Sequence, residues 1–340
     1  MGKLYTVLAI SFTILVLANL VFFIINIIFW ATNGLQALLD GMNFVERIYY
    51  SVYFKWILLG DGLWLVFLLI FMVSRKHYKT DPQKHYLSYL KQFEPKICVV
   101  LPTFNEEKSV GDVIKNFKKQ KQVKDIVVVD NNSDDKTVEI AKKFNVTVVT
   151  KDVNKGYADS CLIGLTESLK TDSNIIVLSD ADGTFDGSDL SKIIPYLENC
   201  DMVIGSRQIQ VLTEKGNQNS MFYVWGNLFI AKLMQIKYFS LLHMGVVQLT
   251  DVGCAFRAIR SDSLSKIIEE LGNSKNKRAL ESKNWLFTLM MTMTCIEHDL
   301  KIVEVPITFK KRIGTSKSEA NIKSKGILYG LKFIWYIISR

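Results

Sequence analysis

The stretch ICVVLPTFNEE, residues 97–107, decides the fold class. Its first part, residues 97–101, is apolar without interruption, and a polar turn follows it directly. A short continuous apolar run of this kind is typical of a strand buried on both faces of a parallel sheet. Similar runs recur along the chain, with amphipathic stretches between them, at Ile126–Val129, Val146–Val149, Ile175–Leu178 and Met202–Ile204. This alternation predicts an α/β domain with a mostly parallel sheet covered by helices.

Polar turns follow the first four predicted strands, at Pro102–Glu107, Asp130–Asp135, Asn154–Tyr157 and Ser179–Gly183. Ligands of an open parallel sheet bind beyond the carboxyl ends of its strands, so these turns mark the expected site. Asp180 and Asp182 are separated by one residue, which puts two hard oxygen ligands on one turn. Such a pair suits an Mg²⁺ or Mn²⁺ ion that bridges a diphosphate. The sequence therefore predicts a metal ion and a diphosphate at this turn.

From about Lys96 to Lys317, the order and spacing of the motifs resemble the glycosyltransferase family 2 enzymes of the GT-A fold, and within them the dolichol-phosphate or polyprenyl-phosphate glycosyltransferases. The segments that carry the resemblance are Asp180–Asp182, Gly205–Arg207, Thr250–Arg257 and Arg312–Lys317. The resemblance implies a Rossmann-like sheet, a UDP- or GDP-linked sugar donor, and an Mg²⁺ or Mn²⁺ ion held by Asp180 and Asp182. It also implies residues around the nucleotide sugar: Pro102, Asn105, Glu106, Asp130, Asp134, Lys155, Gly156 and Asp180.

The acceptor decides which catalytic groups are needed. A lipid phosphate is anionic at neutral pH, so it attacks the anomeric carbon without losing a proton, and cationic side chains serve to hold it. The cations expected around it are Arg207, Arg257, Arg312 and Lys317. A hydroxyl acceptor would instead need a general base, for which Asp251 is the choice. We predict that Asp182, Asp251, Arg207 and Arg312 carry the catalysis.

The predicted reaction is the metal-dependent, inverting transfer of a single sugar from the donor to a polyprenyl (dolichyl) phosphate. The alternatives are a glycosyltransferase that acts on a glycolipid or diacylglycerol hydroxyl, and an inactive, membrane-tethered nucleotide-sugar-binding protein. The processive-synthase signature QxxRW is absent, which favours one transfer per encounter. A dinucleotide-dependent dehydrogenase is excluded because the turn after the first predicted strand lacks GxGxxG.

Two apolar segments near the start of the chain, about 4–31 and 56–74, predict transmembrane helices. The first has 28 residues without a charge, more than the roughly 20 that cross a bilayer. Six basic residues against two acids lie between Arg75 and Lys96, whereas the loop between the two segments is balanced. By the positive-inside rule, both termini and the catalytic domain are cytoplasmic and the loop is external. The chain is thus expected to be an integral membrane protein.

The predicted organisation has four parts. Residues 1–79 hold the two transmembrane helices and the external loop, 80–95 form a basic linker, 96–317 form the GT-A domain, and 318–340 form a basic, apolar helix at the bilayer interface. The 12 apolar-rich residues Ile327–Ile338 are too short to span.

Composition limits the remaining classes. The chain has 340 residues, 49% of them hydrophobic, with a net charge of +9 and few Gly and Pro, which excludes a disordered or collagen-like protein. Its mean hydropathy is +0.17, which favours contact with lipid. Five scattered cysteines argue against a disulfide framework or a CxxC metal site. The basic clusters flank lipid-seeking segments, so the lipid bilayer and phosphates are the expected partners and nucleic acid is not. The oligomeric state has no signature in the sequence.

Overall fold

The computed structural model describes residues 94–217, 220–238, 248–273, 286–314 and 323–340, together with isolated positions between 21 and 87. The chain divides into two units, residues 1–79 with 338–340 and residues 80–337. The predicted membrane spans, 4–31 and 56–74, lie almost wholly outside the described residues. Among the residues that are described, no helix is both long and apolar enough to cross a membrane. The two spans therefore stay predictions.

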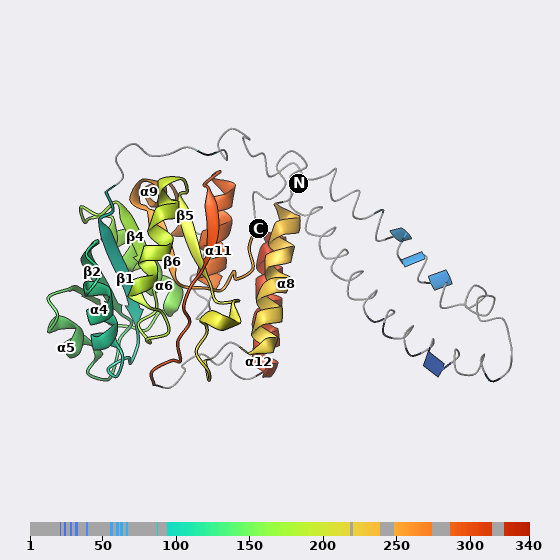
Figure 1. The fold of residues 1–340 in the computed structure, drawn as a ribbon, viewed down its shortest axis with the longest axis horizontal. Helices are drawn as coiled ribbons and strands as arrows, with labels where there is room; N and C mark the ends of the chain where they lie inside the picture. Colours follow the sequence, from blue (N-terminus) through green and yellow to red (C-terminus); the bar gives the residue numbers. More distant parts are fainter. Residues whose placement is uncertain are drawn as a thin grey trace. The chain divides into compact units, whose positions relative to one another are not determined.

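The larger unit is built on a sheet in which seven described strands follow the order β3-β2-β1-β4-β6-β5-β7 (Figure 1). The strands are β1 Ile97–Thr103, β2 Val123–Asp130, β3 Thr147–Thr150, β4 Ile175–Leu178, β5 Met202–Ser206, β6 Arg257–Arg260 and β7 Ile302–Pro306. Neighbouring strands are parallel, except that β6 runs antiparallel to β4 and β5. The prediction of a mostly parallel sheet is confirmed.

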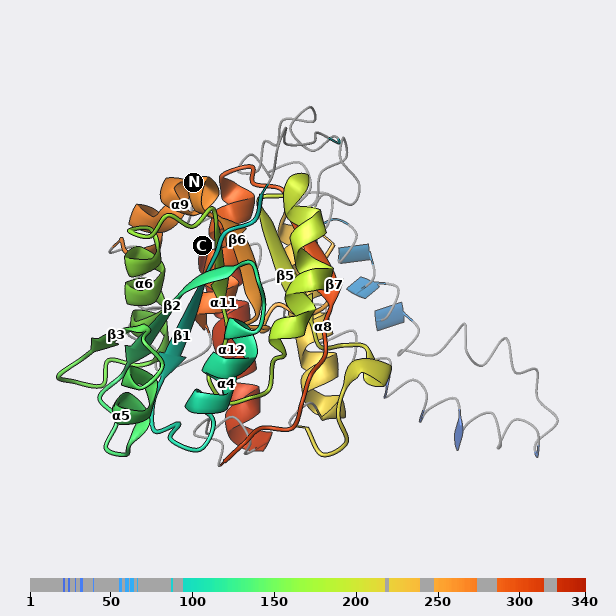
Figure 2. The ribbon, with the colours of Figure 1, turned by 60° about the vertical axis from the view of Figure 1, so that its left-hand side comes forward.

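Helices cover both faces of this sheet. They are α4 Val110–Lys118, α5 Thr137–Lys142, α6 Tyr157–Ser168, α7 Leu190–Ile193, α8 Met221–Lys237, α9 Ser261–Leu271, α11 Leu286–Glu297 and α12 Lys323–Ser339, with short 3-10 turns η2 Gly187–Asp189, η3 Ile194–Glu198 and η4 Gln210–Leu212. Helices α6, α9 and α11 contact one another on one face, and α4 and α5 pack together on the other (Figure 2). Helix α12 lies within residues 318–340, and the place of this segment at the bilayer interface stays a prediction.

Strands β1 and β4, whose ends carry the expected site, are buried along their whole length. This burial explains why their sequences are apolar without alternation. Helix α6 lies very close to this part of the sheet because it has no side chain at Gly164. A methyl group built on Gly164 would lie 2.3 Å from Val100 Cγ1 and 3.0 Å from Val129 Cγ2. Close packing of α6 on β1 and β2 holds the start of α6 beside the strand ends.

Replacing Gly164 by alanine should lower the free energy of unfolding by about 1–3 kcal/mol, because the added methyl group overpacks the α6 interface. Urea unfolding of the full chain in detergent, followed by circular dichroism, measures the change. Gly226→Ala in α8 is the control, since nothing lies within 4 Å of a methyl group built there. Equal stability of Gly164→Ala and the unaltered protein would contradict the close packing of α6.

Candidate active site

The turns after β1 and β2 hold each other through side chain to backbone hydrogen bonds. The Asn105 N–H donates to Ser133 Oγ at 2.8 Å, and Asn105 Oδ1 accepts the Asp134 N–H at 2.8 Å. Asn105 has a φ of 54°, a left-handed conformation that asparagine tolerates better than most residues. The buried carboxylate of Asp130 accepts both the N–H and the hydroxyl of Ser133. Asp130 therefore shapes the turn, while the Asp134 side chain is exposed.

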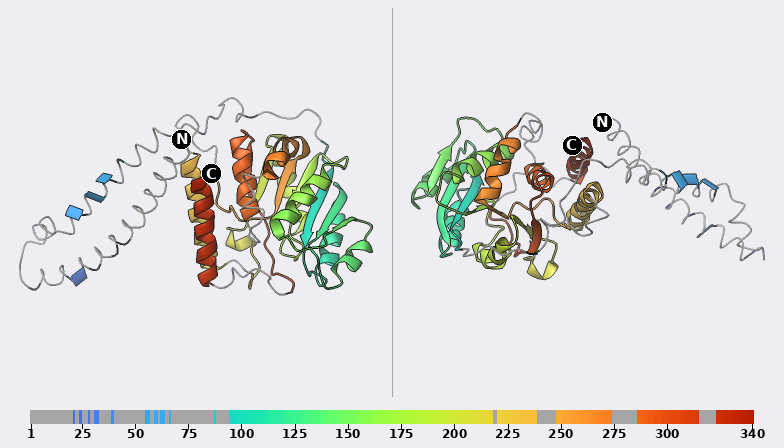
Figure 3. Two further views of the ribbon diagram at one scale, coloured as in Figure 1. Left: turned by 180° about the vertical axis from the view of Figure 1, so that it is seen from behind. Right: turned by 90° about the horizontal axis from the view of Figure 1, so that it is seen from above.

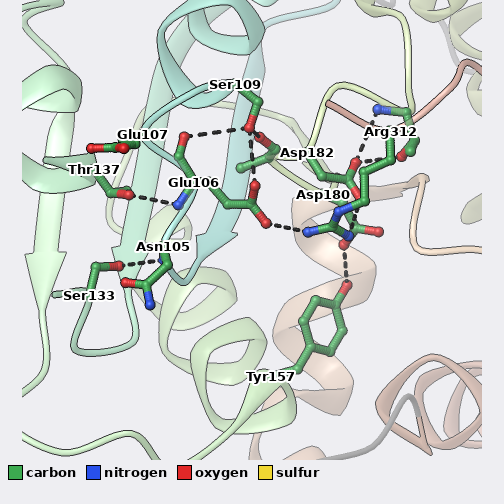
Figure 4. A network of polar contacts seen from close by, with 12 residues as sticks. Asn105, Glu106, Glu107, Ser109, Ser133, Thr137, Tyr157, Asp180, Asp182 and Arg312 are labelled. Carbon is green, nitrogen blue, oxygen red and sulfur yellow. Dashed lines mark hydrogen bonds and ion pairs between the residues drawn. The ribbon is translucent and has the colours of Figure 1, made fainter. Parts of the chain in front are cut away.

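Arg312 joins two carboxylates that come from different strand ends (Figure 4). Its Nη1 donates to Asp182 Oδ2 at 2.7 Å and its Nη2 donates to Glu106 Oε1. Ser109 Oγ bridges the same two turns, with the Ala181 carbonyl at 2.8 Å and Glu106 Oε2 at 3.1 Å. The turn after β1, the turn after β4 and the segment after β7 thus meet at one point, as expected for the carboxyl edge of a parallel sheet.

The turn that carries Asp182 is fixed by its own backbone and by Thr184. Thr184 donates its N–H and its hydroxyl to Asp182 Oδ1, at 3.0 and 2.6 Å. The Ile313 N–H donates to the Asp182 carbonyl at 3.0 Å. Gly183 has a φ of +81°, and a methyl group there would lie 2.8 Å from Ile313 Cδ1. The left-handed conformation at this position strongly favours glycine.

The second carboxylate of the pair, Asp180, lies beside Tyr157 and Asp182. The Tyr157 hydroxyl donates to Asp180 Oδ1 at 2.9 Å. Burial, and next the charge of Asp182, raise the pKa of Asp180 to about 7, although Tyr157 and the nearby arginines act in the opposite direction. Burial and the Asp180 charge hold the pKa of Tyr157 well above its usual value. The site therefore concentrates negative charge that a cation would relieve.

A divalent metal fits this donor set. Asp180 and Asp182 supply carboxylate oxygens, the ligands that Mg²⁺ and Mn²⁺ prefer, and the charge of Asp182 is one cause of the raised pKa of Asp180. No cluster of three or more His, Cys, Asp or Glu side chains suited to a metal occurs among the described residues. The pair therefore suits an ion that takes its remaining ligands from a diphosphate and from water.

Arg207 and Asp251 form a bidentate ion pair. Arg207 Nε donates to Asp251 Oδ2 and its Nη2 to Asp251 Oδ1, both at 2.7 Å, and the Arg207 N–H adds a third bond at 3.1 Å. Asp251 is fully buried. Burial alone would raise its pKa, but the charge and hydrogen bonds of Arg207 outweigh burial and hold the pKa below its usual value. Asp251 is therefore a weak base in this arrangement.

Arg257 does not face the site, which corrects the expectation that it binds an acceptor phosphate. The side chain is fully buried. Its guanidinium donates to the carbonyls of Cys254, Val252 and Thr288 at 2.6–3.0 Å and to Thr292 Oγ1 at 2.6 Å. These bonds tie the start of β6 to α11 and to residues 252–254. Arg257 therefore has a structural role in shaping the segment that follows Asp251.

The other residues that were predicted to bind the nucleotide sugar or the acceptor lie in different environments. Pro102 is buried in β1 opposite Val129, whereas Lys155 is exposed and donates its N–H to Asn131 Oδ1 at 3.2 Å. Gly156 begins the turn into α6 with a φ of +96°. Lys317 lies outside the described residues. The structure adds contacts from residues without an assigned role in the sequence analysis, namely Ser109, Asn131, Tyr157 and Thr184.

Comparisons with known proteins identify relatives of this chain. A family model described as "Glycosyl transferase family 2" matches residues 98–268. An uncharacterized protein of Methanocaldococcus jannaschii is 34% identical over 249 residues, which cover 71% of this chain and 90% of that protein. An undecaprenyl-phosphate mannosyltransferase of Micrococcus luteus is 26% identical over 252 residues, covering 71% of this chain and 96% of the enzyme. Glucosyl-3-phosphoglycerate synthase from Mycobacterium tuberculosis, solved with Mn²⁺ and UDP-glucose, has a TM-score of 0.46 at 17% identity, and the match covers 71% and 79% of the two chains.

Replacing Asp180 by asparagine should stabilise the metal-free protein at pH 8 much more than at pH 5. The pKa of Asp180, about 7 in the folded chain, lies above the usual aspartate value. The carboxyl group of Asp180 therefore holds its proton more tightly in the native state than in the unfolded chain. Its contribution to the free energy of unfolding falls as the pH rises from about 4 to about 7. Asparagine carries no charge at either pH, so the variant does not lose this stability as the pH rises.

The measurement is the urea concentration at the midpoint of unfolding, for the variant and the unaltered protein, in EDTA at pH 5 and pH 8. The exposed Asp134, on a neighbouring turn, provides the control variant Asp134→Asn. If Asp180→Asn gains no more stability at pH 8 than at pH 5, the folded protein does not raise the pKa of Asp180.

Proposed function

The chain belongs to glycosyl transferase family 2, and from this membership we propose that it transfers one hexose from a nucleotide-diphosphate sugar to a polyprenyl or dolichyl phosphate. The relative from Micrococcus luteus is named for mannosyl transfer to undecaprenyl phosphate, which supports this acceptor class. The donor is a UDP- or GDP-linked sugar, and the transfer is a single displacement with inversion. The bond between the anomeric carbon and the diphosphate breaks as a lipid phosphate oxygen forms the new bond, and the electron pair leaves with the nucleoside diphosphate.

The Arg207–Asp251 ion pair is the observation that carries the choice of acceptor. A hydroxyl nucleophile needs a base that accepts its proton. Asp251, the acid expected in that role, is buried, bonded three times by Arg207 and held at a low pKa. A phosphate nucleophile is already an anion and needs no such base. The cation in this pair and the guanidinium of Arg312 instead favour binding of a phosphate.

Each charged side chain of the site then has a separate task. Asp180 and Asp182 would hold Mg²⁺ or Mn²⁺, which supplies Lewis-acid neutralisation of the leaving diphosphate. Arg207, over the ring of Phe309 with its Cζ 5.4 Å from the centroid, and Arg312 hold and orient the acceptor phosphate. The bond from Arg312 to Asp182 places the acceptor beside the donor, so positioning and charge provide the catalysis.

Two neighbouring helices support a position at the bilayer surface. Helix α8 exposes Met221, Phe222, Trp225 and Phe229, and α12 exposes Ile327, Leu328, Leu331 and Trp335. The helices lie side by side (Figures 1 and 3), and Lys237 Nζ donates to the Ile337 carbonyl at 2.5 Å. Neither helix contains Asp or Glu, and both contain Lys. We call these eight side chains the α8–α12 face; apolar and basic helices of this kind bind anionic lipid interfaces.

Helix α8 also reaches the site. A methyl group built on Gly253 would lie 3.1 Å from Asn227 Oδ1 and 3.4 Å from Arg207 Nη2. One helix thus exposes Trp225 and Phe229 while Asn227 lies near Arg207. A lipid whose phosphate binds at Arg207 would therefore keep its polyprenyl chain in the bilayer, next to the exposed side of α8. We place the catalytic domain and both termini on the cytoplasmic side, on the basis of the basic residues between Arg75 and Lys96.

The acceptor is tested with the full chain, a panel of UDP- and GDP-sugars, and either polyprenyl phosphate or the matching polyprenol. Mass spectrometry of the lipid product should detect a single added hexose on the phosphate and none on the alcohol. Arg312→Gln should lower transfer by at least about 10-fold, because it removes a charge-assisted contact of about 1.5–3 kcal/mol and leaves Asp182 and Glu106 without their shared cation.

The control for that variant is Lys311→Gln, because Lys311 is exposed and its contact with Glu214 is made by the backbone N–H. It should transfer at the rate of the unaltered protein. Two results together would contradict a phosphate acceptor: sugar transferred to polyprenol, a glycolipid or diacylglycerol, and an Arg312→Gln variant as active as the unaltered chain. The acceptor group would then be a hydroxyl.

The membrane position is tested by cysteine labelling with an impermeant reagent, in a background that carries Cys200→Ser. Asn43→Cys should react in intact cells, and Gln122→Cys only after permeabilisation. Trp225→Cys should stay slow after permeabilisation, because lipid covers the α8–α12 face. Rapid labelling of Trp225→Cys would contradict lipid contact, and the reverse pattern at 43 and 122 would contradict the orientation.

A further inference from the structure

We propose that Tyr157 is a positioning residue that fixes the orientation of Asp180 and connects it to the turn before α6, residues 154–156. The inference rests on the proposed function, because that function gives Asp180 a metal to bind. Its starting point is the hydrogen bond from the Tyr157 hydroxyl to Asp180 Oδ1, at 2.9 Å. Figure 4 shows the ring of Tyr157 directed at Asp180, on the side away from Glu106.

The backbone in front of Tyr157 determines where its side chain lies. Tyr157 is the first residue of α6 and directly follows Gly156, whose φ is +96°. Glycine adopts this conformation readily and other residues rarely do. The chain therefore turns sharply at Gly156 and enters the helix with Tyr157 already beside the end of β4. Helix α6 itself is held close to the sheet at Gly164.

Hydrogen bonds connect this turn to the end of β2, where Asp130 is expected to lie near the nucleotide. Asn154 Oδ1 accepts the Gly156 N–H at 3.0 Å and Asn131 Nδ2 at 2.7 Å. Asn131, the residue after β2, accepts the Lys155 N–H at 3.2 Å through its own Oδ1. A continuous polar chain thus runs from the end of β2 through Asn154 to the start of α6. Tyr157 is the member of this segment that reaches Asp180.

The contact leaves one carboxylate oxygen of Asp180 for a metal. A tyrosine hydroxyl is protonated at neutral pH and donates one hydrogen bond, and here that donor occupies Oδ1. Within the described part of the chain, no side chain or backbone group bonds to Asp180 Oδ2. Groups that hydrogen-bond a metal ligand orient it, and their removal typically weakens metal binding by about 10- to 100-fold. Tyr157 thus presents Asp180 Oδ2 in a fixed direction.

The test is Mn²⁺ binding to the full chain in detergent, with UDP or GDP present, measured by electron paramagnetic resonance of the unbound ion. Tyr157→Phe removes the hydroxyl and keeps the ring. We expect Mn²⁺ affinity to fall about 10- to 100-fold. A residue that only packs would leave the affinity unchanged in this variant.

Tyr238→Phe is the matched control. Tyr238, the residue after α8, is also buried, and its hydroxyl donates to a carboxylate, Glu297 Oε1 at 2.6 Å, at the end of α11. Tyr238→Phe removes the same kind of hydrogen bond, at a place that does not touch Asp180 or Asp182. Mn²⁺ affinity should therefore stay at the level of the unaltered protein, whatever the change in stability.

Asp182→Asn separates the inference from the function it rests on. If this variant loses Mn²⁺ binding while Tyr157→Phe binds as tightly as the unaltered chain, the role of Tyr157 is wrong and the metal site stands. If Asp182→Asn binds Mn²⁺ as the unaltered chain does, the proposed metal site is wrong and the role of Tyr157 is lost with it.

Discussion

The guanidinium of Arg312 is the interaction on which the rest of the site depends. It bonds Asp182, which lies 130 residues earlier in the chain, and Glu106, which lies 206 residues earlier. Both carboxylates are buried, and buried carboxylates without a partner are strongly destabilising. The segment after β7 therefore stabilises the turns after β1 and β4 by neutralising a carboxylate in each. The backbone bonds from Lys310 to Thr184 and from Ile313 to Asp182 hold the segment there.

The sequence predicted those features that depend on local pattern. The five expected strands are β1 to β5. Strands β1, β4 and β5 are buried throughout, which explains their apolar sequences. Membership in glycosyl transferase family 2, expected from the order of the motifs, is confirmed. Strand β6 was not predicted, because Arg257–Arg260 is a four-residue strand that begins and ends in arginine. Its antiparallel place between β4 and β5 depends on tertiary contacts.

In the site, too, the residues marked by local sequence pattern were predicted, and the contacts that depend on tertiary structure were not. Asp180, Asp182 and Glu106 were predicted because each follows a buried strand, and the structure brings them to one edge of the sheet with Arg312. The pairing of Arg207 with Asp251 and the burial of Arg257 could not be predicted, because both depend on which side chains meet across β5, β6 and α11. Tyr157 lies in a turn that the sequence marked, but its contact with Asp180 depends on the entry angle of α6.

The central claim is that Asp180 and Asp182 form the metal site at which the nucleotide diphosphate binds. Anomalous diffraction from crystals of the full chain grown with Mn²⁺ and a nucleoside diphosphate measures this most directly. The account predicts one strong manganese peak in contact with the carboxylates of Asp180 and Asp182, with the diphosphate bound to the same ion. A diphosphate bound without manganese there, or a manganese peak away from both carboxylates, would contradict it.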